Sequence, residues 1–501
     1  MARQARLGGG DPAREQCHLA APGADVRRVV LTAVAATATV VALAGCSRVV
    51  TGEAVSIYAD PFAVAGLPAT DGPSGPRPDA PRAMLSIHGA NGSDADALAS
   101  SAISDLSAFW STEYPAVFAG NFRPVTDLAS WDPNVDGTGR FCGESTYGVV
   151  NAGYCTRDGS IGWDRTILLP TLTDTFGPMA VVMVIAHEYG HAIQHDSGLA
   201  GADSPTLVLE QQADCFAGAY MRYVAAGESN RFTLNTSDGL NAVMAAMVAV
   251  RDTDPSDPEA VHGNAFERIT AFQTGFTLGA RGCTEIDEAE VADRRAQLPR
   301  VFTQSGESGD MPVTEQSVGM IVDSLNTVFG LTQPPNVVYS GADTGCPDAA
   351  ATEPVSYCPA TRTIGVSMPE LSDRGTPRDV GAAGGDVDEL AVDIRGDFSA
   401  FGLVASRYAL AVQQQDGYPL TEPSTALHTA CLTGVWTAST AAGGTPALSP
   451  GDLDEAVSGL LTDGLMASDV DGETVPSGFA RVDAYRAGVL GGPDVCTNRY
   501  G

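Results

Sequence analysis

Two histidines four positions apart, His187 and His191, constrain this 501-residue chain most strongly, because Glu188 directly follows the first of them. An apolar run at 181–185 precedes the pair, so we expect a helix that begins near Met179. Residues four apart share one face of a helix, so both imidazoles can bind one metal ion beside the carboxylate. This pattern is typical of zinc hydrolases. The alternative is a surface helix with two unrelated histidines.

A catalytic zinc site also takes a third protein ligand and keeps one position open. Glu210 and Asp214 lie one helical turn apart further along the chain. In one large class of such sites, the third ligand is a glutamate with an aspartate one turn beyond it. We therefore expect Glu210 to complete the metal site. We expect Asp214 to accept a hydrogen bond from a ligand imidazole, most readily that of His187, and so to fix its tautomer.

A histidine as third ligand is disfavoured. The extended pattern H-E-x-x-H-x-x-G-x-x-H fails, because Ile193 and Ser197 occupy the positions of its glycine and last histidine. His195 lies on the same helical stripe, but it is about 12 Å along the helix from His187. We interpret His195 as an exposed or rim residue.

At these residues the chain resembles the neutral zinc metallopeptidases, and it looks most like lipoprotein peptidases of actinobacteria. The family carries H-E-[YF]-G-H, then E-x-Q-A-D-C-F-A-G, then an H-G segment before an arginine-containing helix. The matching segments here are 187–191, 210–218 and 262–268, and the resemblance covers about residues 90–285. It departs from the family at 264–266. The resemblance implies a zinc metallopeptidase, and we expect a zincin-like α+β domain with its active helix packed under a small sheet.

The expected mechanism assigns a role to each residue of the site. Zinc would lower the pKa of a water molecule toward 7, and Glu188 would take the proton and later return it to the leaving amine. His262 is the expected hydrogen-bond donor to the tetrahedral oxyanion, with Tyr220 and Tyr223 as alternatives. The substrate would be a peptide or protein.

The charge of the chain excludes one class of partner. The net charge is −33, and all 28 basic residues are arginine. Such a surface repels nucleic acid and argues against a polybasic membrane-binding face.

The start of the chain has the features of an export signal. Arg27 and Arg28 precede an uncharged apolar run at 29–44, and the sequence Leu-Ala-Gly-Cys ends at Cys46. This looks like a lipobox, which implies cleavage before Cys46 and attachment of a lipid to its thiol. The mature protein would then be lipid-anchored on the extracytoplasmic face of the cell membrane. The alternative is an uncleaved N-terminal anchor in the same membrane.

Composition and motifs divide the chain into four parts. We expect a lipoprotein signal peptide at 1–45, a Pro- and Gly-rich tether at 46–92, a zinc metallopeptidase domain at 93–310 and a second domain at 311–501. Polar caps at 93–96 open an amphipathic segment at 97–110, which predicts a helix. The oligomeric state is left open.

Cysteine spacing indicates an internal repeat. Eight cysteines remain after Cys17 and Cys46 are set aside, at positions 142, 155, 215, 283, 346, 358, 431 and 496. The separations 13 and 68 in the first set recur as 12 and 65 in the second, and the surrounding sequence repeats too. Of the 105 possible pairings, the repeat favours Cys142–Cys155, Cys215–Cys283, Cys346–Cys358 and Cys431–Cys496.

The second copy is expected to lack a metal site. Aligning 192–194 with 411–413 places 406–410 opposite the histidine motif and sets Ala426 and Ala430 opposite Glu210 and Asp214. By the same comparison Arg268, matched by Arg481, is expected to be structural. A different interpretation is a zinc-binding pseudopeptidase scaffold whose inactive copy presents a partner-binding surface.

Overall fold

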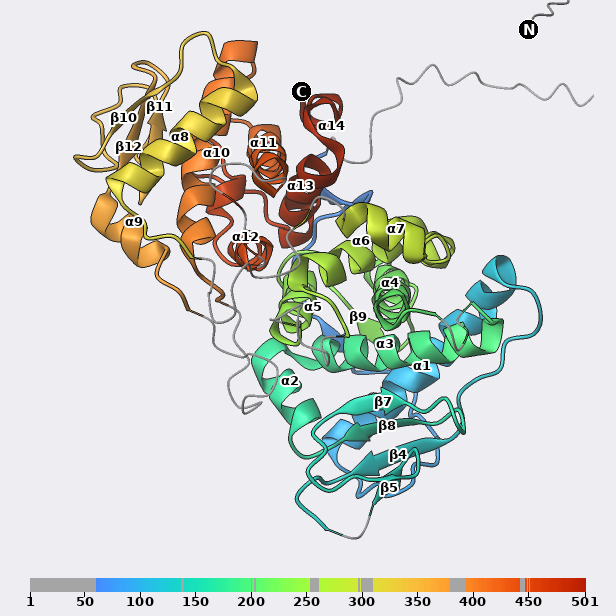
Figure 1. Ribbon diagram of the computed structural model, residues 1–501. Coiled ribbons are helices and arrows are strands. Elements are labelled where there is room, and N and C mark those ends of the chain that lie inside the picture. The colour runs from blue at the N-terminus through green and yellow to red at the C-terminus, as the bar shows by residue number, and fades with distance from the viewer. Residues whose placement is uncertain are drawn as a thin grey trace, which may run out of the picture. The chain divides into compact units, whose positions relative to one another are not determined.

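The computed structural model describes residues 60–501, except 137–138, 200, 202–203, 253–260, 296–297, 299–309, 379–392, 442–446, 448 and 450. These residues all belong to one compact unit. Helices dominate it, with short strands among them (Figure 1), so the expected α+β mixture is confirmed. The expected signal peptide and Cys46 lie outside the described residues. Among the described helices, none is both long and apolar enough to cross a membrane.

The two domains expected from the sequence divide the chain into a first half, residues 93–310, and a second half, residues 311–501. Before and within the first half the elements are β1 (Ala63–Val64), β2 (Leu67–Pro68), β3 (Gly75–Pro76), α1 (Asp94–Val117), β4 (Leu128–Trp131), β5 (Arg140–Phe141), β6 (Glu144–Ser145), β7 (Ala152–Tyr154), β8 (Ile161–Asp164), α2 (Leu168–Phe176), α3 (Pro178–Ser197), α4 (Thr206–Ala225), β9 (Phe232–Thr233), α5 (Asp238–Ala249), α6 (Ala265–Cys283) and α7 (Glu288–Arg295). The second half contains α8 (Glu315–Phe329), β10 (Asn336–Val338), β11 (Val355–Cys358), β12 (Thr363–Val366), α9 (Met368–Arg374), α10 (Asp397–Asp416), α11 (Pro423–Ala441), α12 (Asp452–Leu461), the 3₁₀ turn η2 (Leu465–Ala467), α13 (Gly478–Gly491) and α14 (Pro493–Tyr500).

Helix α1 begins where its sequence predicts. Ser93 is its N-cap and accepts a hydrogen bond from the amide of Asp96. Ile103 and Leu106 lie on its fully buried face. The buried carboxylate of Asp96 accepts hydrogen bonds from Ser130 Oγ (2.5 Å) and Trp163 Nε1 (3.0 Å), which fixes α1 against the sheet.

The sheet of the first half has the strand order β4-β8-β7. Strand β4 is parallel to β8, and β7 is antiparallel to it. Helix α3 contacts β7, the edge strand of this sheet, and it crosses the same region in Figure 1. The expected packing of the active helix on a small sheet is therefore present.

The two helices that carry the histidine motif and Glu210 approach each other closely. Gly190 of α3 makes this possible, because a Cβ there would lie 2.9 Å from Ala213 Cα of α4. Helix α3 starts at Pro178 and ends before Gly198, whose left-handed conformation terminates it. A glycine inside the motif thus sets the distance between the two ligand-bearing helices.

Helices α4 and α6 also pack at backbone distance. A Cβ on Gly218 would lie 2.1 Å from Phe272 O, and one on Gly275 would lie 1.7 Å from Cys215 O. The disulfide Cys215–Cys283 joins the same two helices. All four disulfides in the structure join the pairs expected from the repeat.

The second half also contains a three-stranded sheet and closely packed helices. Its sheet has the order β10-β12-β11, with β10 parallel and β11 antiparallel to β12. Helices α11 and α13 pack closely through Gly434 and Gly488, where a Cβ would lie 2.1 Å from Tyr485 O and 1.8 Å from Cys431 O.

The helix breaks near the second cysteine of each half also correspond. Gly279 interrupts α6 with φ 70° and ψ −173°. Gly492 separates α13 from α14 with φ 73° and ψ −173°. Each glycine stands four residues before a disulfide cysteine, Cys283 or Cys496, so the same turn positions the same bridge.

The expected tether is wrong for the part that the structure describes. From residue 60 this segment packs on the first half, where β3 pairs with β9. Thr70 N donates to Thr236 Oγ1 (2.8 Å), and Arg77 Nε donates to the carbonyls of Ser229 and Phe232. Composition misled here, because a Pro- and Gly-rich segment can satisfy its backbone groups against polar residues distant in sequence.

Buried contacts join the two halves. Arg251 Nε donates to Asp454 Oδ2 (2.9 Å), and both side chains are buried. The other oxygen of Asp454 accepts from Ala265 N, the first residue of α6. Gln273 Nε2 donates to Phe479 O. Helix α12 therefore holds the start of α6 in place.

Replacing Gly218 with alanine should destabilise the protein by roughly 1–3 kcal/mol, because the methyl group would overlap the carbonyl of Phe272. Gly319 of α8 is the matched control, since a Cβ there meets nothing within 4 Å. G319A should stabilise the protein by up to about 1 kcal/mol through helix propensity. Urea unfolding with intact disulfides measures both, and equal effects of the two substitutions would contradict the close packing.

Removing the Asp454 carboxylate should lower the free energy of unfolding by roughly 3–5 kcal/mol, because D454A removes the negative charge that pairs with the buried Arg251. A double variant, R251L with D454L, should recover most of this loss. The measurement is a double-mutant cycle from urea unfolding. Additive losses in the double variant would show that the two charges do not interact across the halves.

Candidate metal centre

Three side chains from α3 and α4 converge on one point. His187 Nε2 lies 3.1 Å from Glu210 Oε2, and His191 Nε2 lies 3.5 Å from Glu210 Oε1. One ligand atom from each of these three residues lies within 4.8 Å of the other two. The structure thus brings together the three metal ligands expected from the sequence. Two imidazole nitrogens and a carboxylate oxygen form a donor set that suits zinc.

The outer nitrogen of each histidine is held by a neighbour. His187 Nδ1 lies 2.8 Å from Asp214 Oδ1, and His191 Nδ1 lies 2.9 Å from Gln194 Oε1. Both rings therefore present Nε2 to the same point, which is the arrangement that fixes the tautomer of a metal ligand. Sequence reasoning missed Gln194. Its position three residues after His191 on one helix face was the available signal.

Arg268 has a role at this site, which corrects the expectation that it is only structural. Its guanidinium makes two hydrogen bonds to Asp214, Nε to Oδ2 at 2.9 Å and Nη2 to Oδ1 at 2.8 Å. Arg481, its counterpart in the second half, donates instead to the carbonyls of Leu460 and Val475. The same buried arginine is therefore used differently, because the position equivalent to Asp214 is an alanine in the second half.

Electrostatics in the site favour a negative Glu210 and a protonated His187 in the metal-free chain. Burial lowers the pKa of His187, but the carboxylates of Asp214 and Glu210 outweigh this effect and raise it to about 10. Burial raises the pKa of Asp214, but Arg268 and His187 lower it to about 2. Burial also opposes ionisation of Glu210, yet hydrogen bonds from His187 and His191 hold its pKa well below its ordinary value.

Glu188 borders a small cavity beside the converging ligands. The cavity has a volume of about 90 Å³. Apolar residues of α2, α3 and the end of α5 line most of it, together with His187, Glu188, His262, Arg268 and Asn151. The carboxylate of Glu188 therefore faces a space next to the metal ligands, which is where a general base is needed.

His262 lies at the edge of the site. Its Nε2 is 3.7 Å from Glu210 Oε2, its Nδ1 is 3.5 Å from Asp252 Oδ1, and 43% of its side chain is exposed. Asp252 and Gly263 also exchange hydrogen bonds, which holds the segment around His262. Asn264, which follows Gly263, is the N-cap of α6 and forms a capping box with Glu267. This residue departs from the family pattern, and here it stabilises the start of the helix.

The tyrosine alternative for the oxyanion donor is wrong for Tyr220. Its hydroxyl is fully buried and donates to Asp105 Oδ2 at 2.8 Å. Tyr223 stacks on Tyr220 and lies against Phe109, within the same aromatic cluster. Neither tyrosine lines the cavity beside Glu188.

A second cavity opens on the other side of the ligands. Its volume is about 660 Å³, and its lining includes Tyr154, Thr156, His191, His195 and Glu210. His195 is exposed there, as expected for a rim residue. The cavity beside Glu188 and this larger one therefore flank the metal ligands, and the two ends of β7 border them.

The equivalent place in the second half is packed core. Arg407, aligned with Glu188, is fully buried and donates to Val355 O and Ser468 Oγ. Leu410, Ala426 and Ala430, which align with His191, Glu210 and Asp214, have no exposed surface. His428 is a buried histidine against Tyr418, and burial lowers its pKa to about 4.

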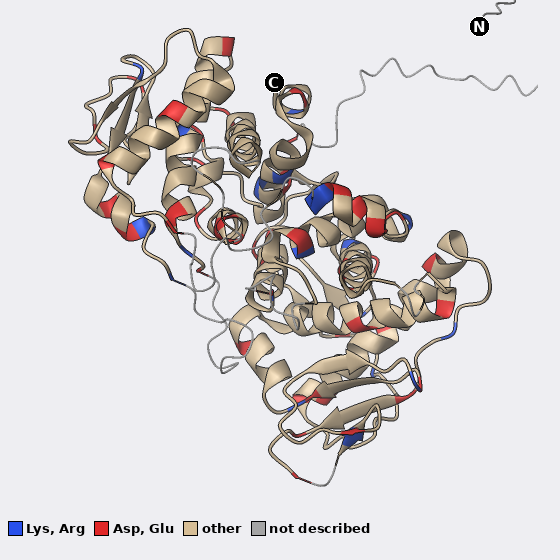
Figure 2. Ribbon diagram, in the orientation of Figure 1, with Lys and Arg blue, Asp and Glu red and all other residues tan. Residues whose placement is uncertain are grey.

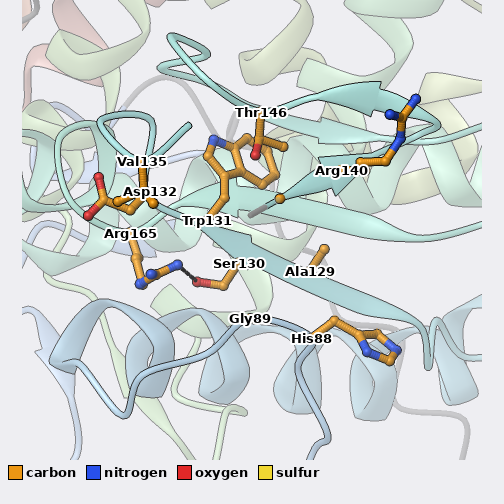
Figure 3. A pocket seen from close by; sticks show the side chains of 11 residues that line it. His88, Gly89, Ala129, Ser130, Trp131, Asp132, Val135, Arg140, Thr146 and Arg165 are labelled. Carbon is orange, nitrogen blue, oxygen red and sulfur yellow. Dashed lines mark hydrogen bonds between the residues drawn. The ribbon is translucent and has the colours of Figure 1, made fainter. Parts of the chain in front are cut away.

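A further cavity of about 270 Å³ lies at the opposite edge of the first-half sheet (Figure 3). It is lined by residues of β4 and neighbouring loops, and Arg165 Nη1 donates to Ser130 Oγ at 3.4 Å across it. None of the metal-site residues lines this cavity. It is therefore separate from the candidate metal centre.

Zinc binding to the metal-free chain should release at least about one proton at pH 7. The imidazole of His187 is protonated up to its raised pKa, and zinc must displace that proton from Nε2. Affinity should therefore increase as the pH rises from 5 to 9. Titration calorimetry in buffers with different ionisation enthalpies counts the protons. D214N should lower the count at pH 8, and a heat independent of the buffer would contradict the assignment.

Comparison with known proteins bears on the same part of the chain. Uncharacterized proteins of Mycobacterium tuberculosis and Mycobacterium bovis are 30% identical to it over 168 residues. This segment covers 28% of the chain and 56% of each relative, so the chain spans about half the length of the curated relatives it matches. No solved structure matches the chain. Residues 45–285, which include every residue of the metal centre, match the model of a family described as putative neutral zinc metallopeptidase.

Proposed function

We propose that this chain is a zinc metallopeptidase that hydrolyses peptide bonds. One observation carries the proposal: His187, His191 and Glu210 converge on one point while Glu188 faces the adjoining cavity. A structural zinc site is closed by four protein ligands and has no use for a neighbouring carboxylate. Three ligands beside a cavity leave room for water and substrate.

The residues present fit zinc. Both histidines offer Nε2 while their other nitrogens are held by Asp214 and Gln194, so each ring is oriented before a metal arrives. When bound, zinc would lower the pKa of a water molecule and polarise the substrate carbonyl. Arg268 keeps the buried Asp214 ionised, and Asp214 in turn keeps His187 in the required orientation.

Glu188 would perform the proton transfers. As general base it takes a proton from the attacking water, and as general acid it delivers that proton to the amine of the leaving peptide. His262 is the proposed donor to the developing oxyanion, and Asp252 at 3.5 Å from its Nδ1 would orient the ring. Its partial exposure suits a residue that meets substrate.

The cavities beside the ligands support a peptide substrate. A chain bound across the site would place residues on both sides of the scissile bond. The space of about 660 Å³ on one side can take several residues, whereas the space of about 90 Å³ beside Glu188 suits one apolar side chain. Space for substrate residues on both sides of the metal ligands is what cleavage of a peptide bond requires.

We further propose that the mature protein is a lipoprotein on the extracytoplasmic face of the cell membrane, attached through Cys46. The four disulfides support an oxidising compartment. The leader and the lipidated cysteine are proposed from the sequence alone, since both lie outside the described residues.

The second half is proposed to be a degenerate copy of the first. Support comes from the matching strand order, the paired glycine contacts and the corresponding disulfides. Its contacts suggest a use: Asp454 holds both Arg251 and the start of α6, on either side of the segment that carries Asp252 and His262. We propose that it braces this part of the active site.

Replacing Glu188 with glutamine should lower kcat by about 10²–10⁴-fold and leave zinc content unchanged, because the variant loses proton transfer but keeps the metal ligands. Cleavage of a mixed peptide library by the whole zinc-loaded chain, together with zinc analysis, measures both. H88Q is the matched control, since the exposed His88 lines neither cavity beside the metal ligands. An E188Q protein with full activity would refute the mechanism.

The same experiment separates the alternative scaffold function. One zinc per wild-type chain without any cleavage of the library would favour a pseudopeptidase scaffold. Cleavage that E188Q abolishes would favour the peptidase.

A further inference from the structure

Three carboxylates gather around the start of α10. They belong to Asp310, Asp397 at the first turn of α10, and Glu455 on α12. One oxygen from each lies within 4.8 Å of the other two. Acidic segments occur at the corresponding end of α10 and on α12 in Figure 2. This cluster belongs neither to the metal centre on α3 and α4 nor to any cavity beside it.

The cluster is buried, which distinguishes it from a solvated acidic patch. Only 5% of Asp397 and 5% of Glu455 is exposed, while Asp310 is partly exposed. A fourth carboxylate, Asp452, is 6% exposed and raises the pKa of Glu455 from close by. Among the described residues, no arginine or histidine forms a salt bridge with Asp397, Asp452 or Glu455. Burying several such groups without a counter-charge is costly.

Hydrogen bonds satisfy only part of this cluster. Met311 N donates to Asp397 Oδ2 (2.8 Å), and Ser399 N donates to Glu455 Oε2 (3.0 Å). The second oxygen of Asp397, Oδ1, is buried and has no hydrogen-bond partner among the described residues. A buried carboxylate oxygen without a donor is open to a ligand such as a cation.

Gly396 keeps the space between the carboxylates free. A Cβ at this position would lie 2.1 Å from Glu455 Oε1 and 2.6 Å from Asp310 Oδ1. The two oxygens therefore face the same small region beside the backbone of Gly396. Any side chain here would separate them.

We propose that Asp310, Asp397 and Glu455 bind a hard divalent cation, Ca²⁺, at the start of α10. Donors that are all carboxylate oxygens favour calcium or magnesium over zinc. Calcium accepts irregular arrangements with ligand distances of about 2.3–2.6 Å, which three oxygens at this spacing can provide around one ion. Water would supply the remaining ligands, and the nearby Asp452 would supply further negative charge.

The electrostatics of the metal-free cluster agree with this assignment. Burial and the neighbouring carboxylates raise the pKa of Asp452 to about 8 and that of Asp397 to about 6. Without a cation, protons must therefore neutralise part of the cluster near neutral pH. A bound Ca²⁺ would replace them.

The cation would join three separate parts of the chain. Asp310 ends the first half, Asp397 starts α10, and Glu455 lies on α12. Asp454, beside Glu455 on α12, holds the start of α6. A cation here would therefore stabilise the helix through which the second half supports the first.

The test uses the whole purified chain, stripped of metals and reloaded with one equivalent of zinc so that the α3–α4 centre is occupied. CaCl₂ is then titrated by calorimetry, and thermal unfolding is recorded with and without 1 mM CaCl₂. We expect one Ca²⁺ per chain, with a dissociation constant of about 10⁻⁴ M or tighter, and a Tm increase of at least about 1 °C.

Two double variants decide the assignment. D397N with E455Q should lose Ca²⁺ binding at least about tenfold, and in calcium-free buffer it should be no less stable than wild type, because the buried repulsion is gone. E315Q with D323N removes two exposed carboxylates of α8 and should bind Ca²⁺ as wild type does. Absence of Ca²⁺ binding by wild type, or equal binding by D397N/E455Q, would overturn the proposal. These readouts do not depend on peptidase activity.

Discussion

The ion pair between Asp214 and Arg268 is the interaction on which the metal centre depends. Asp214 has no exposed surface, so its charge is tolerable only because Arg268 makes two hydrogen bonds to it. The same carboxylate holds His187 from behind and leaves Nε2 directed at Glu210. One buried carboxylate thereby connects α3, α4 and α6 and orients a metal ligand.

The second half has a buried arginine at the aligned position but no carboxylate beside it. Its arginine, Arg481, bonds to backbone carbonyls instead, and Ala430 packs in the place equivalent to Asp214. The close helix packing persists, because it depends on glycines such as Gly434 and on disulfides rather than on the site. The helix packing of the second half therefore does not depend on metal ligands.

Each half manages buried charge in its own way. In the first half, the carboxylates of Glu210 and Asp214 are paired with His187 and Arg268 at the candidate metal centre. In the second half, the carboxylates of Asp397, Asp452 and Glu455 lie together without cationic partners among the described residues. Helix α12 links these two arrangements, because it carries Glu455 of the acidic cluster and Asp454, which binds Arg251.

The sequence by itself determined the ligand set, its outer partner Asp214 and the disulfide pairs, because helical periodicity and repeated cysteine spacing are local or countable signals. Tertiary structure alone decided that Arg268 pairs with Asp214, that Tyr220 is committed to Asp105, and that the segment from residue 60 packs on the domain. It also decided which carboxylates are buried together. These outcomes depend on contacts between residues tens to hundreds of positions apart, and composition and periodicity carry no information about which distant partner satisfies a buried polar group.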